Sequence, residues 1–353
     1  MELLISDGWL FMMIDKLVLL IKNKISVRLK EIIKNIYENI IVFFDYTYDI
    51  FRYYRYSGMT LNFKNKKKLR SVITINYHAI EKGLSLNDPR SGFGQPVLKR
   101  LIYFINMYVS LYGFDETIIY SISTIKKYVD FHKIIDIKYE YLDAFLFSYK
   151  KNTDDFGDVV GGIKSIEKKD ILTSIKGDFR DFAFCRYSIR DFDEALVSDN
   201  LIRGAIDIAR KTPSVCNRPT TNIYIYSSKD MKKNILSLQN GNRGFGNKAS
   251  HVIIVTSELA CFNGAKERNQ SFIDGGLMAM SLVYALHSKG LGTCFLNWAV
   301  GARQDVRLRR IISIPASNNI ITLIAVGSLP ERFNVAQSNK VDFNDVVHFE
   351  KLE

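Results

Sequence analysis

The stretch "SHVIIVTS" at residues 250–257 decides the fold class of the C-terminal part of the chain. It is a short apolar run rich in β-branched residues, which is typical of a buried strand. "NIITLIAVG" (319–327) predicts a second buried strand, and "TNIYIYS" (221–227) alternates as a third strand does. Between these runs, "QSFIDGGLMAMSLVYALHSKG" (270–290) predicts a buried helix that ends at its glycine. The region from 166 onward is therefore predicted to alternate strands and helices around one sheet.

The residues before 166 have a different pattern. Residues 1–165 are rich in Ile, Tyr, Phe and Lys at helical spacing, which predicts a mostly helical N-terminal region. "EKGLSLNDPRSGFGQP" (81–96) interrupts it with glycines and prolines and predicts a long structured loop, and helices are expected soon after it. Acids and glycines without periodicity near 151–165 predict a linker. We expect two domains, 1–165 and 166–353.

The composition limits the partners and the compartment. A formal net charge of +12 suits an anionic ligand, nucleic acid, an anionic membrane surface, or only a solvated basic surface. No nucleic-acid-binding module is recognisable, so we expect no nucleic-acid partner. The four cysteines are widely spaced and lack zinc spacing, which predicts reduced thiols in the cytoplasm. The five scattered histidines predict no metal site.

The start of the chain allows a membrane alternative. Apolar side chains at Trp9, Phe11 and Met12 precede a series of lysines, so weak peripheral contact with a membrane competes with a helix packed on its own protein. Charged residues interrupt the apolar runs, so no membrane span is predicted there.

"RYSIRDF" (186–192) is the most informative polar segment. In an extended conformation Arg186, Ser188 and Arg190 point to the same side and offer two guanidiniums and a hydroxyl to one anion. Two surface arginines are the alternative. The glycines of "GNRGFGNKA" (241–249) precede a strand, which excludes the dinucleotide-binding fingerprint, and neither a P-loop nor a nucleophile elbow occurs.

Several segments, taken in order, resemble the motifs of the flavin-dependent nitroreductase family. The resemblance covers about residues 175–353 and leaves the N-terminal half unassigned. The segments that carry it are "RYSIRDF" (186–192), "TPSVCNRPTTNIYIYS" (212–227), "GNRGFGNKASHVIIVTS" (241–257), "KGLGTCFLNW" (289–298), "IAVGSLPE" (324–331) and "SNKVDFNDVVHFE" (338–350).

The resemblance implies an α+β fold with a central, mainly antiparallel sheet flanked by helices. It also implies FMN at the interface of a homodimer, NADH or NADPH as electron donor, and ping-pong hydride transfer to a small organic acceptor. Because the flavin carries the redox chemistry, no protein acid or nucleophile is expected to be essential.

The resemblance implies a cofactor-binding role for twelve residues of this chain. Arg186, Ser188 and Lys340 would hold the FMN phosphate, and Arg190 would lie near the pyrimidine edge of the flavin. Asn242 would hydrogen-bond the flavin ring. The remaining residues line the ring, from the same subunit or from the second one. They are Phe295, Leu296 and Asn297 from the same subunit, and Pro213, Ser214, Val215 and Asn217 from the second.

Three departures from the family pattern leave questions open. Arg218 stands where the family has Gln, and the tail offers one clear base, Lys340, where two are common, unless Arg332 contributes. The segment 77–94 either caps the flavin pocket or is a structural connector. Cys216 is interpreted as a small buried filler rather than a redox thiol.

The leading hypothesis is an FMN-dependent oxidoreductase. Two alternatives stay open at this point: a flavin-dependent dehydrogenase or oxidase that tailors a biosynthetic intermediate, and a degenerate flavin-binding scaffold whose helical N-terminus binds a partner.

Overall fold

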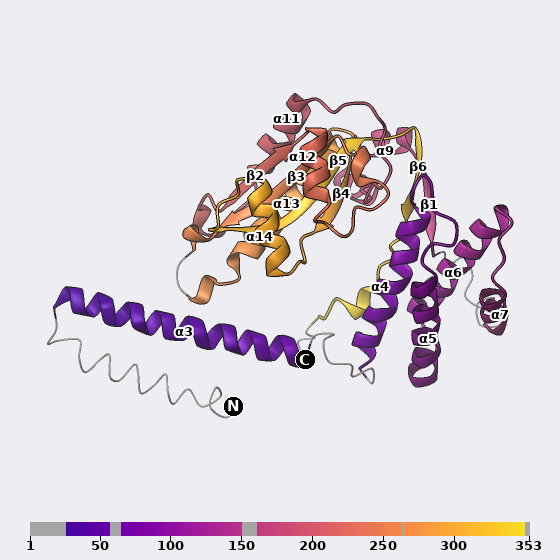
Figure 1. Cartoon of the computed structure of the whole chain (residues 1–353), viewed down its shortest axis with the longest axis horizontal. Coiled ribbons are helices and arrows are strands. Elements are labelled where there is room, and N and C mark those ends of the chain that lie inside the picture. The colour runs from indigo at the N-terminus through magenta and orange to yellow at the C-terminus, as the bar shows by residue number, and fades with distance from the viewer. Residues whose placement is uncertain (1–25, 57–64, 150–160, 263–264, 350–353) are drawn as a thin grey trace. The chain divides into compact units, whose positions relative to one another are not determined.

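The computed structural model describes residues 26–56, 65–149, 161–262 and 265–349 (Figure 1). The chain divides into two compact units. One unit comprises Met1–Thr60 with Phe262–Asn269, and the other comprises Leu61–Cys261 with Gln270–Glu353. The N-terminal segment with the apolar side chains proposed for membrane contact lies outside the described residues. Among the residues that are described, no helix is both long and apolar enough to cross a membrane.

The smaller unit is built on the helix α3 (Val27–Tyr56). The short 3-10 helix η4 (Ala265–Glu267) packs on α3. Arg268 fastens this contact, since its guanidinium lies 2.8 Å from a carboxylate oxygen of Asp49 and 3.1 Å from one of Asp45.

The larger unit contains a four-stranded antiparallel sheet, as predicted for the fold class. The strands are β2 (Thr221–Tyr226), β3 (His251–Glu258), β4 (Leu291–Asn297) and β5 (Asn318–Ser328), and their order is β2-β3-β5-β4. β3 and β5 lie in the centre, which explains why their sequences are apolar runs with little alternation. The predicted strands at 221–227, 250–257 and 319–327 are confirmed.

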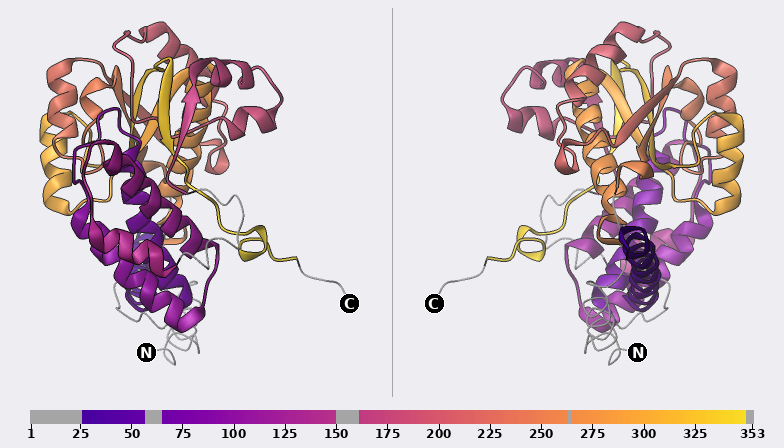
Figure 2. Two further views of the ribbon diagram at one scale, coloured as in Figure 1. Left: turned by 90° about the vertical axis from the view of Figure 1, so that its right-hand side faces the viewer. Right: turned by 90° about the vertical axis from the view of Figure 1, so that its left-hand side faces the viewer.

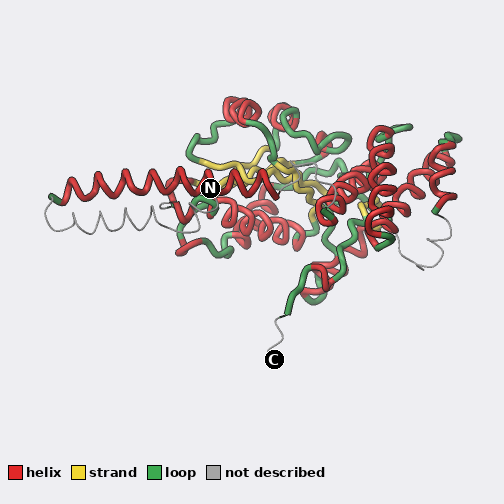
Figure 3. The backbone as a smooth tube through the Cα atoms, turned by 90° about the horizontal axis from the view of Figure 1, so that it is seen from below, coloured by secondary structure: helices red, strands yellow, loops and turns green. Residues whose placement is uncertain are grey.

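Helices cover both faces of this sheet (Figure 3). On one face, alternate strand residues such as Ile253 and Ile324 share a core with α11 (Asp199–Ala209) and α13 (Gln270–Ser288). On the other face, Ile254 and Leu323 share a core with α12 (Lys229–Leu236) and α14 (Ala302–Ile311). This alternation follows from the period of two in a strand.

A second, two-stranded sheet joins the start and the end of the domain. β1 (Ile163–Glu167) pairs antiparallel with β6 (Arg332–Ala336). The helices α9 (Lys168–Ser174) and α10 (Phe179–Phe184) follow β1. The predicted linker falls mainly in 150–160, outside the described residues, but its end at Gly161 and Gly162 leads directly into β1.

The N-terminal helices of the larger unit pack on one another around their own core (Figure 2). The helices are α4 (Lys66–Leu84), α5 (Gln95–Tyr112), α6 (Glu116–Ile134) and α7 (Glu140–Ser148). The prediction of a loop over 81–96 is wrong at its start, because α4 continues to Leu84 and buries Ile80 and Leu84. The loop itself is residues 85–94, and it contains Gly92 (φ 66°) and Gly94 (φ 71°) in the left-handed region.

The last turns of α4 are tied to the sheet domain. Glu81 is fully buried, and its carboxylate accepts hydrogen bonds from the backbone N of Gly162 at 3.3 Å and lies 2.9 Å from Nδ1 of His78. Leu86 packs against the core that contains Ile189 and Phe245. The N-terminal helices and the sheet are therefore in direct contact.

Candidate functional site

The segment 186–190 runs along the edge strand β4. The backbone N of Ile189 donates to the carbonyl O of Thr293 at 2.8 Å, and Ser188 forms a parallel bridge with Thr293. Ile189 is buried in the core, whereas Arg186 and Ser188 are half-buried. The structure thus places Ser188 and Ile189 directly beside β4, with Arg186 and Arg190 close to them in sequence. The prediction that the three polar side chains share one anion stays a prediction.

Three cations influence the pKa of one buried thiol on β4. Burial raises the pKa of the Cys294 thiol, and Arg190, Lys82 and Arg186 each oppose that rise. Lys82 comes from α4 and lies in the segment 77–94, whose role the sequence left open. Its pKa is lowered, first by burial and then by the positive charge of Arg190. The site therefore includes a residue from outside the segments that resemble the family.

These cations have no acidic partner. Within the described parts of the chain, no carboxylate lies within ion-pair distance of Lys82, Arg186 or Arg190. Arg190 is 9 % exposed, and its Nη1 donates only to the carbonyl O of Ser188, at 3.4 Å. Buried and half-buried cations without counter-charges are costly to desolvate, so the cluster suits a bound anion.

The β4 residues predicted to lie against the flavin do not share one face. Leu296 is buried in the core beneath the sheet, while Phe295 and Asn297 expose their side chains on the opposite face. Phe295 is 37 % exposed. Only Phe295 and Asn297 can thus offer side chains to a ligand, and Leu296 can offer its backbone.

The glycine-rich loop is closed by the amides of Gln239 and Asn242. Nδ2 of Asn242 donates to the carbonyl O of Leu236 at 2.8 Å and of Gln239 at 2.5 Å. Gln239 in turn donates to the carbonyl O of Asn297 at 3.0 Å, which joins the loop to the end of β4. Because the N–H groups of Asn242 are used within the loop, its Oδ1 is the atom left to accept from a ligand.

The turn 213–218 is held by Asp274 and Arg218. Asp274 is buried, and its Oδ2 accepts from the backbone N of Val215 at 3.2 Å. Arg218 donates through Nε to the carbonyl O of Val215 at 3.2 Å and through Nη1 to that of Cys261 at 2.5 Å. Arg218 stands where the family has Gln. It joins the turn to the short 3-10 helix (Leu259–Cys261) that follows β3. Nothing in the sequence pattern indicated the role of Asp274.

The expectation that Cys216 is buried is wrong, because its side chain is exposed. Cys216 (φ 50°) and Asn217 (φ 55°) both adopt the left-handed backbone region. Two such residues in succession make a tight turn that projects its tip outward. Pro213 is also exposed, and Ser214 uses its hydroxyl to donate to the carbonyl O of Arg218 at 2.6 Å.

Within one chain the turn and the cations lie toward different ends of the sheet. The turn leads into β2 beside Ser257, which pairs with Asn319 of β5. The arginine segment bridges Thr293, which pairs with Val326 of β5. Asn319 and Val326 are separated by roughly 23 Å of strand. One chain therefore does not bring these two sets of predicted residues together.

Lys340 lines a cleft that contains none of the other eleven predicted residues. It is exposed on the C-terminal tail and lines a cleft of about 240 Å³ with Arg70 and Thr74 of α4 and Asp115 before α6. Thr74 precedes Lys82 by roughly 12 Å of helix. Arg332, the other candidate base, is paired with Glu167 at 2.7 Å.

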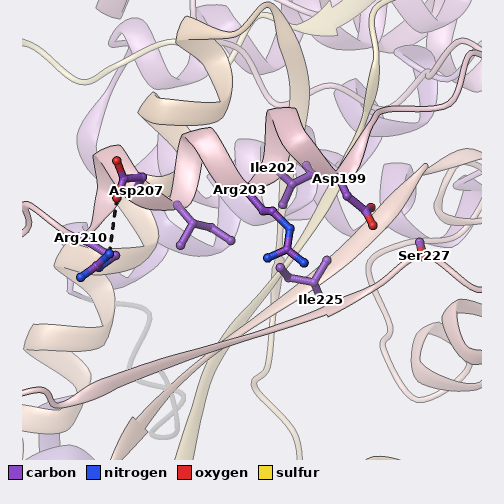
Figure 4. Close-up of a pocket in the computed structure, with 8 residues that line it drawn as sticks. Asp199, Ile202, Arg203, Asp207, Arg210, Ile225 and Ser227 are labelled. Atoms are coloured by element: carbon purple, nitrogen blue, oxygen red, sulfur yellow. Dashed lines mark hydrogen bonds and ion pairs between the residues drawn. The ribbon is translucent and has the colours of Figure 1, made fainter.

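The larger described cleft is not part of the predicted site. It has a volume of about 450 Å³ and lies between α11 and the edge strand β2. Figure 4 shows Arg203 extending from α11 toward Ile225 of β2, and Asp207 paired with Arg210 at 3.4 Å. None of the twelve predicted residues lines it.

Comparisons with known proteins identify the C-terminal region. A model of the nitroreductase family matches residues 184–240 and 232–328. This stretch is therefore a nitroreductase-family region, as the resemblance predicted, and the N-terminal helices stay unassigned. No curated protein matches the chain.

Several solved structures of nitroreductases and a related oxidase are similar to about half of the chain. A nitroreductase family protein from Clostridium novyi NT has 17% identity and a TM-score of 0.40, over 44% of this chain and 86% of its own. A putative NADH oxidase from Clostridium acetobutylicum has 16% identity and a TM-score of 0.41, over 47% and 97%. An FMN-dependent nitroreductase from Clostridium difficile has 18% identity and a TM-score of 0.39, over 48% and 98%.

Proposed function

We propose that the protein is an FMN-dependent oxidoreductase that transfers hydride between NADH or NADPH and a small organic acceptor by a ping-pong route. The observation that carries the proposal is the pair Arg186 and Arg190, which lies in the part of the chain that the nitroreductase-family model matches and has no acidic partner among the described residues. FMN, when bound, supplies the hydride chemistry. The protein supplies position and charge.

The residues present fit an anionic flavin. Arg186, with the hydroxyl of Ser188, would hold the phosphate through charge-assisted hydrogen bonds. Arg190 would lie at the pyrimidine edge, where positive charge favours the reduced, anionic cofactor. Phe295 and Asn297 would lie against the ring, and Oδ1 of Asn242 would accept a hydrogen bond from it. Lys340 would reach the phosphate only if the C-terminal tail left its cleft beside α4.

A homodimer is part of this proposal. The turn with Pro213, Val215 and Asn217 would serve the cofactor of the second copy, which agrees with its distance from the cations of its own chain. The helix that anchors the turn, α13, also exposes apolar side chains, with Ile273 52 % and Leu277 45 % exposed. An exposed apolar stripe of this kind marks an interface. We expect Leu277→Asp to convert a dimer to a monomer in light scattering, and a monomeric wild type would overturn this part.

The compartment proposed is the cytoplasm. All four cysteines are free in the structure, which supports a reducing environment.

The direct test is the purified protein. A bound flavin should show in the visible spectrum, and added FMN should raise the melting temperature by mass action. A colourless protein whose melting temperature FMN leaves unchanged would overturn the proposal and favour a degenerate scaffold.

A further inference from the structure

The C-terminal end of α4 packs against the nitroreductase-family region at two places. Leu86, just after the helix, packs on the core that contains Cys294 and Phe245. The approach at the glycine-rich loop is close, since a Cβ added to Gly244 would lie 2.9 Å from Cδ1 of Leu86. Gly244 also has φ +91°, a conformation that suits glycine. Gly244 thus permits the close approach of Leu86, which follows α4.

Lys82 lies at this contact, one turn before Leu86. It is half-buried, and in the described part of the chain its ammonium has neither an ion pair nor a hydrogen bond. The positive charge of Arg190 contributes to lowering the pKa of Lys82, and both cations also act on the pKa of the buried Cys294 thiol. Two like charges that act on one another at a half-buried site repel, so a bound anion would stabilise this arrangement.

The acids nearest in sequence do not supply that anion. Glu81 is directed to the backbone N of Gly162 and to His78. Asp191 is paired with Lys248, whose Nζ lies 3.4 Å from its carboxylate. Both carboxylates are therefore engaged away from Lys82 and Arg190.

We propose that Lys82 completes the FMN site from outside the family region, at the pyrimidine edge beside Arg190. The inference rests on the proposed function and adds that the N-terminal helices form part of the cofactor site. A second cation near this edge would stabilise the reduced, anionic cofactor more than the oxidised one. Lys82 would thus raise the reduction potential and tighten the binding of reduced FMN.

The experiment compares Lys82→Gln and Lys82→Arg with Lys67→Gln, which changes an exposed lysine at the other end of α4. The readouts are the FMN dissociation constant and the midpoint potential of bound FMN. In Lys82→Gln, we expect the ratio of the affinities for reduced and oxidised FMN to fall about tenfold. This corresponds to a fall of about 30 mV in the midpoint potential of a two-electron couple. Lys82→Arg should retain most of the preference, and Lys67→Gln should match the wild type.

The outcomes separate the two proposals. If wild-type protein binds FMN but Lys82→Gln leaves both the potential and the dissociation constant unchanged, the inference is wrong and the proposed function stands. A higher KM for an anionic acceptor with an unchanged potential would also overturn it, because Lys82 would then bind substrate. A wild-type protein that binds no FMN overturns both. Since Lys82 has no ion pair to lose, its replacement should not lower the melting temperature, which shows that the variant is folded.

Discussion

The carboxylate of Asp274 accepts a hydrogen bond from the backbone N of Val215, 3.2 Å away, and so joins α13 to the tip of the turn 213–218. The same carboxylate accepts from Oγ1 of Thr220 at 2.8 Å and from Nε2 of Gln270 at 2.8 Å. One buried acid thus fixes the turn at both ends. The geometry of the segment predicted to reach the second subunit depends on α13, the helix that also exposes the apolar stripe.

Replacing Asp274 should therefore loosen the turn and destabilise the fold. In Asp274→Ala, the hydroxyl of Thr220 loses its acceptor while it stays buried, and the half-buried N–H of Val215 loses its acceptor too. We expect a loss of about 2 kcal/mol or more in the free energy of unfolding, measured in urea. Asp207→Ala is the matched control on α11, because its pair with Arg210 is exposed on both sides and worth little. Equal stability of the two variants would contradict this role of Asp274.

Arg186→Ala should release FMN. The variant removes a half-buried guanidinium that has no acidic partner in the described chain, so the loss should fall on the ligand rather than on the fold. We expect FMN affinity to fall by at least about tenfold, as for a charged hydrogen bond. Arg180→Ala is the control, since Arg180 lies over the ring of Phe184, 5.5 Å from its centroid. The measurement is FMN fluorescence on titration, and equal affinities would refute the assignment.

The thiols should differ sharply in reactivity. Cys216 is exposed at the tip of the turn, whereas Cys294 is buried and its pKa is raised by burial. We expect a thiol reagent to label Cys216 at least about tenfold faster than Cys294. FMN should slow the labelling of Cys216 if the turn reaches the cofactor of the second copy. Cys216→Ser supplies the control by removing the fast phase, and a fast phase that survives in it would contradict the assignment.

Much of the fold follows from the sequence because local patterns and tertiary structure agree there. The apolar runs of β3 and β5 are central strands, and Ser198 accepts from the backbone N of Leu201 at 3.4 Å as an N-cap should. The start of the loop 81–96 was mispredicted, since Gly83 lies inside α4. A Cβ at Gly83 would meet the ring of Phe93, so this glycine serves close packing rather than a helix end.

The site was less predictable, because it depends on contacts between distant segments. Alternation in an extended segment is enough to group Arg186, Ser188 and Arg190 as candidates, and their role stays a prediction. No local signal places Lys82 of α4 beside β4, or Asp274 beneath a turn that lies 59 residues away in sequence. The exposure of Cys216 also depends on a left-handed backbone that residue type alone does not indicate.

Stability should depend on pH through His287, which lies beside the site. Burial, with a smaller contribution from Arg186, lowers the pKa of His287 to about 4, against an ordinary value of 6.5. The neutral ring lies 3.1 Å from the carbonyl O of Phe182 and 3.2 Å from Sγ of Cys185. At pH values between these two pKa values, His287 binds a proton in the unfolded chain but not in the folded chain. Stability contributed by His287 is therefore complete above pH 6.5 and is lost as the pH falls toward 4.

The loss over this interval should be about 3 kcal/mol in the free energy of unfolding, measured in urea at a series of pH values, since each pH unit between the two pKa values contributes about 1.4 kcal/mol. His287→Gln removes the titrating group and should flatten the slope between about pH 6.5 and 4. His348→Gln is the control, because His348 is exposed on the C-terminal tail. If the wild type and His287→Gln lose stability in parallel as the pH falls, the acid sensitivity belongs to other groups.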